Sequence, residues 1–206
     1  MKNGMSRGEV ALLLVFTLQL VGCGGGPTIK KLNSSSVIVA FGDSLTFGYG
    51  AGQDDSYPVV LSGLMAGQVF NAGVPGEDSS AALRRLPGVL ERESADLVIL
   101  CSGGNDMLQK QSRQKMKANL EQMIRLIKES GAEVVLIGVP EPGLRLKVPD
   151  LYEDLAQQHQ LPYDGETISE ILSSAALKSD LVHPNEEGYK LMAEAFFSLI
   201  RKSTGD

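Results

Sequence analysis

The chain has 206 residues, 43% of them hydrophobic, which is enough for one domain with a full core. Its net charge of −6 and its isoelectric point near 5.0 argue against a general affinity for nucleic acid or anionic lipid. Tryptophan is absent and aromatic residues make up only 5%, so stacking platforms for sugars or bases are not evident. The sequence shows no repeat at a solenoid period and no zinc-type cluster of cysteine and histidine, so no metal site is expected.

The first 22 residues have the pattern of an export signal. Lys2 and Arg7 form a basic start, and the mostly apolar segment 10–21 is too short to span a bilayer. It ends in Leu-Val-Gly-Cys, which resembles the bacterial lipobox and implies cleavage before Cys23 and acylation of its thiol. A secretory signal without lipidation is the alternative.

Lipidation of Cys23 predicts an exported bacterial lipoprotein that a lipid anchor holds in the cell envelope, on the periplasmic side. The residue after Cys23 is Gly24 and not an aspartate, which favours anchoring in the outer membrane if the organism has an outer membrane. Residues 23–36 are rich in Gly and Ser and are expected to form a flexible tether before a folded domain at 37–203. Cys101 would be the only cysteine of the mature chain. Its apolar surroundings predict a buried thiol.

The stretch 37–46, Val-Ile-Val-Ala-Phe-Gly-Asp-Ser-Leu-Thr, begins as a buried strand that Gly42 ends. Asp43 and Ser44 follow at once, where a helix can begin. Ligands bind at this carboxyl edge in open α/β sheets, so Ser44 is a candidate nucleophile. A strand followed by a polar turn is the simpler alternative.

Further strands and helices alternate along the rest of the chain. Apolar runs predict strands at 69–71, 96–101, 134–139 and 161–163. Helices are expected at 57–66, 79–93 (kinked or split at Pro87), 116–127, 151–158, 167–177 and 190–201. This alternation predicts a parallel sheet covered on both faces, in a three-layer α/β/α domain.

The chain has two histidines, and each is a candidate base for a serine nucleophile. His159 lies in a polar stretch with no acidic residue in an obvious register, so a solvated helix-end residue is expected. His183 follows Asp180 by three residues, which lets the carboxylate reach Nδ1 and leaves Nε2 for a serine hydroxyl.

Acyl transfer also needs donors for the developing oxyanion. Candidates are the backbone N–H groups of Ser44 and Gly73 and the side-chain amide of Asn105. The alternatives are an ordinary turn glycine at 73 and an Asx-type cap at 105.

Four blocks now stand in order: Gly42-Asp-Ser-Leu, Asn71-Ala-Gly, Gly103-Gly-Asn-Asp and Asp180-Leu-Val-His. In order and rough spacing they resemble the GDSL or SGNH hydrolase family, and most closely its bacterial thioesterase I/lysophospholipase L1 and arylesterase branch. The resemblance implies a flavodoxin-like SGNH fold with about five parallel strands. It also implies a triad of Ser44, His183 and Asp180, an oxyanion hole of Ser44, Gly73 and Asn105, and no metal or organic cofactor.

The leading hypothesis is a serine esterase that hydrolyses carboxylic esters or thioesters through an acyl-Ser44 intermediate. Two alternatives stay open: a carbohydrate or peptidoglycan O-deacetylase, and a catalytically silent binding lipoprotein. Apolar side chains near the catalytic edge are expected to accommodate an acyl chain, namely Leu45, Phe47, Val74, Leu108, Leu144 and Leu146.

Overall fold

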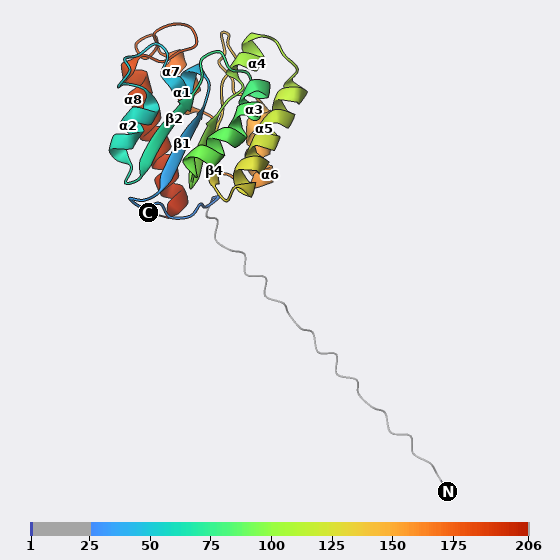
Figure 1. Cartoon of the computed structure of the whole chain (residues 1–206). Coiled ribbons are helices and arrows are strands. Elements are labelled where there is room, and N and C mark those ends of the chain that lie inside the picture. Colours follow the sequence, from blue (N-terminus) through green and yellow to red (C-terminus); the bar gives the residue numbers. More distant parts are fainter. Residues whose placement is uncertain (2–25, 206) are drawn as a thin grey trace.

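The computed structural model describes residue 1 and residues 26–205 (Figure 1). Its centre is a five-stranded, all-parallel sheet in the order β2-β1-β3-β4-β5. The strands are β1 (Val37–Gly42), β2 (Gln68–Gly73), β3 (Leu97–Cys101), β4 (Glu133–Ile137) and β5 (Tyr163–Asp164).

Helices cover both faces of the sheet, which confirms the three-layer α/β/α prediction. Figure 1 shows α2 and α8 on one face and α3, α5 and α6 on the other. The helices are α1 (Ser44–Phe47), α2 (Tyr57–Leu64), α3 (Ser79–Glu93), α4 (Gly104–Leu108), α5 (Arg113–Glu129), α6 (Asp150–His159), α7 (Thr167–Ser173) and α8 (Glu186–Thr204).

The core forms because the central strands are apolar on both faces, as the middle of a covered parallel sheet requires. Every residue of β3 is buried. Helix α5 adds the stripe expected from its periodicity, at Met116, Leu120, Met123, Ile124 and Ile127. The register pairs Gly42 with both Gly73 and Cys101, so β1, β2 and β3 end at the same level. This common level places their following loops together.

Several boundaries differ from the sequence-based expectation. Helix α3 runs through Pro87 as one element, so of the expected kink or split the split is wrong. Helix α7 ends at Ser173, and β5 lies one to two residues later than expected. Helix α1 begins at Ser44, where a helix start is expected, but its extent and the whole of α4 were not predicted, because one turn is too short to show a 3.6-residue period.

Part of the segment assigned to a flexible tether packs on the domain. The backbone N–H of Ile29 donates to Ser203 O at the end of α8 (3.0 Å), and the Ile29 side chain is buried. Cys23 and the signal segment lie outside the described residues. In the part of the chain that the structure describes, no helix is both long and apolar enough to cross a membrane.

Candidate active site

The nucleophile candidate lies on a tight connection between β1 and α1. A Cβ on Gly42 would lie 2.1 Å from Cys101 O and 2.4 Å from Thr46 Oγ1, so only glycine lets β1 run this close to β3 and α1. Asp43 then caps α1, and its Oδ1 accepts the Leu45 N–H at 3.0 Å. Ser44 is therefore the first residue of α1, and its side chain faces the open edge of the sheet.

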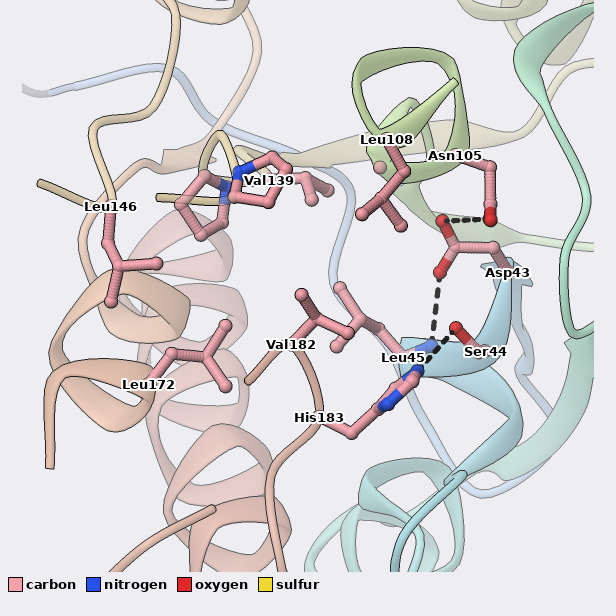
Figure 2. Close-up of a pocket in the computed structure, with 13 residues that line it drawn as sticks. Asp43, Ser44, Leu45, Asn105, Leu108, Val139, Leu146, Leu172, Val182 and His183 are labelled. Atoms are coloured by element: carbon pink, nitrogen blue, oxygen red, sulfur yellow. Dashed lines mark hydrogen bonds between the residues drawn. The ribbon is translucent and has the colours of Figure 1, made fainter. Parts of the chain in front are cut away.

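The structure brings Ser44, His183 and Asp180 into one chain of hydrogen bonds. Ser44 Oγ lies 3.0 Å from His183 Nε2 (Figure 2), and His183 Nδ1 lies 2.8 Å from Asp180 Oδ2. With the proton on Nδ1 donated to the carboxylate, Nε2 accepts from the serine hydroxyl. This is the arrangement in which an imidazole can take the serine proton.

Hydrogen bonds within residues 177–185 fix the loop that carries His183. Ser179 N–H donates to His183 O at 3.0 Å, and Asn185 N–H donates to Leu177 O at 2.9 Å. Asp180 Oδ1 accepts the N–H groups of Val182 and His183. Partial burial acts to raise the pKa of Asp180, but these N–H groups and the His183 imidazole together lower it below its usual value. Asp180 is therefore an anion suited to hold an imidazolium.

His159 lies away from this arrangement, at the end of α6 where the chain enters β5. Its side chain is only 15% exposed and Nε2 lies 3.7 Å from Glu121 Oε1, so the expectation of a solvated residue without an acidic partner is wrong. Burial, with nearby Lys128, lowers the pKa of His159 below its usual value. The packing of α6 against α5 buries it, and a single sequence does not reveal that contact.

The three oxyanion-donor candidates differ in their surroundings. Ser44 N–H belongs to the first turn of α1, where N–H groups lack intrahelical partners. Asn105 Nδ2 lies 3.1 Å from Glu77 O and 3.3 Å from Asp43 Oδ2, and like Ser44 it lines the groove.

Gly73 is placed differently, because its N–H donates to Asn71 Oδ1 at 2.9 Å. A Cβ at Gly73 would lie 2.2 Å from Phe47 N, so close packing under α1 explains this glycine. Gly73 is not among the described residues that line the groove.

Two further residues of the site were not singled out from the sequence. Asp43 is 2% exposed, and burial raises its pKa to about 6, although the bond from Leu45 N–H and the charge of His183 act to lower it. The ring of Tyr49 packs on the His183 ring, with centroids 4.7 Å apart. The sequence signals for Asp43 are its position directly after a buried strand and its place in the Gly42-Asp-Ser-Leu block.

An apolar groove leads away from Ser44 and His183 (Figure 2). Of the residues expected to accommodate an acyl chain, Leu45, Leu108 and Leu146 line it. Phe47, Val74 and Leu144 do not line it and are exposed instead. The other apolar lining residues are Val139, Pro140, Pro142, Leu172 and Val182.

Among residues 26–205, no group of three or more histidine, cysteine or acidic side chains is arranged to hold a metal ion. The reactive groups that line the groove are the Ser44 hydroxyl, the His183 imidazole and the Asp43 carboxylate.

Known proteins share this fold and this sequence pattern. The arylesterase of Vibrio mimicus is 31% identical over 172 residues, which cover 78% of this chain and 86% of the relative. The Escherichia coli K12 protein named Thioesterase 1/protease 1/lysophospholipase L1 is 27% identical over 169 residues, or 78% and 81% of the two chains. Among solved structures, the psychrotrophic esterase EstA from Pseudoalteromonas superposes with a TM-score of 0.74 at 23% identity, covering 84% of this chain and 100% of that one.

The sequence pattern described as the GDSL-like Lipase/Acylhydrolase family matches residues 40–191. This range begins in β1, ends in α8, and includes all four blocks, three at the ends of β1, β2 and β3 and the fourth before α8. The chain therefore belongs to the GDSL-like lipase/acylhydrolase family and is an ester-bond hydrolase.

Proposed function

We propose that the protein is a serine esterase that hydrolyses carboxylic esters or thioesters of apolar acyl groups through an acyl-Ser44 intermediate. The observation that carries this is the hydrogen-bonded chain from Ser44 to His183 to Asp180 at the mouth of an apolar groove. The names of the two relatives, an arylesterase and a thioesterase/lysophospholipase, support the same chemistry.

The reaction needs two proton transfers through His183. In the first step, Ser44 Oγ attacks the ester carbonyl carbon while its proton passes to Nε2, and Nε2 then gives that proton to the leaving oxygen or sulfur. In the second step, water gives a proton to Nε2 as it attacks the acyl-serine, and the proton returns to Ser44 as the acid leaves. Asp180 keeps the imidazole oriented and stabilises its positive form.

The oxyanion of each tetrahedral intermediate would be held by Ser44 N–H and Asn105 Nδ2, which line the same groove. Asn105 Nδ2 donates to Glu77 O and Asp43 Oδ2, and Gly73 N–H donates to Asn71 Oδ1, so each would exchange a bond for one to the oxyanion. We assign Ser44 and Asn105 as the principal donors because they line the groove, and Gly73, which does not, as the third.

The groove favours a hydrocarbon acyl group. Its wall between Ser44 and Leu146 is formed largely by leucine, valine and proline side chains, and each methylene buried there contributes about 0.8 kcal/mol. The alcohol or thiol part of the substrate would leave through the open mouth beside His183.

We also propose that the protein is exported and anchored through a lipid on Cys23, in the envelope of a bacterium and in its outer membrane where there is one. The motif at residues 20–23 supports this, together with the apolar segment before it.

The function is tested by initial rates on p-nitrophenyl esters from acetate to palmitate, for the soluble domain and for Ser44→Ala and His183→Ala. Both variants should stay folded by circular dichroism and lose activity by at least about three orders of magnitude. His159→Ala is the matched control, since it changes a histidine outside the site, and it should keep near-parental rates. Activity that survives Ser44→Ala would exclude the acyl-serine mechanism.

The same assay separates the oxyanion role from substrate binding. Asn105→Ala should lower kcat by about 10²–10³ with little change in KM, because the amide acts on charge that forms only in the transition state. A rise in KM at unchanged kcat would contradict this assignment. A rate profile that peaks at acetate would shift the proposal towards O-deacetylation.

A further inference from the structure

The apolar groove has a definite far end. In Figure 2, Ser44 and Asn105 lie on one side of the groove, and Leu146 and Leu172 lie on the other. Leu172 belongs to α7, whereas Leu146 comes from the connection between β4 and α6. A straight chain whose carbonyl lies at Ser44 would therefore run towards Leu146.

Leu146 also lines a second, larger cavity, so it lies between the two spaces. That cavity is walled by five carboxylates and by the cations Arg145 and Lys147, which flank Leu146 in the sequence. Beyond Leu146 the lining is mixed, with these charged groups beside Val148, Pro149 and Tyr163. A hydrocarbon chain gains less by entering this mixed space than by filling the apolar groove.

The conformation of Leu146 is set by its loop. Glu141 N–H donates to Lys147 O at 3.0 Å and closes the loop, and Glu141 also pairs with Arg113 of α5. Leu146 has a φ of 42°, in the left-handed region that leucine rarely adopts and that persists only where surrounding contacts enforce it. Its side chain packs against the core, whereas Leu144 at the loop tip is fully exposed.

We propose that Leu146 is the end wall of the acyl site and sets the longest acyl chain that the enzyme hydrolyses efficiently. The inference rests on the proposed esterase function and adds to it a specificity-determining residue. Chains that reach Leu146 fill the apolar groove, and longer chains meet its side chain before they reach the second cavity.

The experiment measures kcat/KM for p-nitrophenyl esters in two-carbon steps from acetate to palmitate, in the parent and in two opposite variants. Leu146→Ala removes the wall, so the optimum should move to longer chains, with a gain of up to about fourfold for each methylene that fits into the space left by the leucine side chain. Leu146→Phe enlarges the wall and should move the optimum to shorter chains. Leu144→Ala is the matched control, because it trims an exposed leucine of the same loop, and its profile should match the parent.

If Leu146→Ala and Leu146→Phe both fold and both keep the chain-length optimum of the parent, this inference is overturned, while the proposed esterase function remains. If Leu146→Ala does not fold, the direction of the shift in Leu146→Phe decides, since an unmoved optimum there is contradictory by itself. A shift in Leu144→Ala as large as that in Leu146→Ala would show that loop shape, and not the end wall, controls chain length. Absence of Ser44-dependent hydrolysis in the parent would instead overturn the proposed function, and this inference with it.

Discussion

Asp43 serves both the fold, by capping α1, and the site, by contacting Asn105. One carboxylate oxygen caps α1 at Leu45, and the other accepts from Asn105. The same side chain is almost completely buried next to Ser44. Its burial opposes ionisation, so Asp43 holds its proton to about pH 6 in the native state, whereas an unfolded aspartate releases it near 3.8.

This difference predicts a stability that falls as pH rises. Between about pH 4 and 6 the native state binds more protons than the unfolded state, so the contribution of Asp43 is fully present below pH 3.8 and is lost through pH 6. A shift of roughly two pKa units corresponds to about 3 kcal/mol. Urea denaturation at pH 4 and pH 7 measures the free energy of unfolding of the parent and of Asp43→Asn. The variant lacks the titrating carboxyl, so the difference between its free energy of unfolding and that of the parent should rise by about 3 kcal/mol from pH 4 to pH 7.

Asp54→Asn is the control for the loss of one carboxylate, because Asp54 is exposed. A pH dependence that is the same in the parent and in Asp43→Asn would contradict the burial argument.

At the scale of elements, the turn between β2 and α3 supports the site from behind. Glu77 O accepts from Asn105, and the Glu77 carboxylate pairs with Arg85 of α3 through two hydrogen bonds, at 2.8 and 2.7 Å. Arg85 also donates to Ala72 O at 3.0 Å and lies 4.3 Å over the ring of Phe41. One guanidinium thus ties α3, β1 and the turn together.

We expect Arg85→Met to destabilise the domain by about 3 kcal/mol, because it leaves the Glu77 carboxylate, 6% exposed, buried without its cation. The double variant Glu77→Gln with Arg85→Met should recover part of that loss, since no unpaired charge remains. Chemical denaturation of the parent, both single variants and the double variant measures this coupling. Additive losses would show that the pair does not act as a unit.

At the scale of the whole molecule, the site and the start of the described domain lie at opposite ends. Helix α8 begins near His183 and ends where Ile29 docks, and its 19 residues span about 28 Å. Six Cα–Cα steps lead from Cys23 to Ile29, and fully extended they reach at most about 22 Å. A lipid on Cys23 would therefore hold the end of the domain that is remote from the groove.

For the anchor, we expect Cys23→Ser to abolish labelling with radioactive palmitate and to release the protein from the membrane fraction. Cys101→Ala is the control, because this thiol is completely buried in β3 and should not affect labelling. Labelling that persists in Cys23→Ser, or membrane retention without it, would exclude the lipid anchor.

The sequence by itself determined the three layers of the fold and which blocks come together to form the site. Apolar runs such as that of β3 can be stable only inside a covered sheet, and parallel strands end at one edge, so the blocks after β1, β3 and before α8 had to meet there. The position of Ser44, Asn105 and His183 around one groove follows from this topology.

Only the tertiary structure decided how each side chain is surrounded. It showed that Asn71 Oδ1 accepts the N–H of Gly73, that His159 is partly buried beside Glu121, and that Asp43 is almost completely buried. It also separated Leu146, which lines the groove, from Leu144, which is exposed to solvent. Each of these features depends on contacts between residues far apart in the chain, and local periodicity carries no information about such contacts.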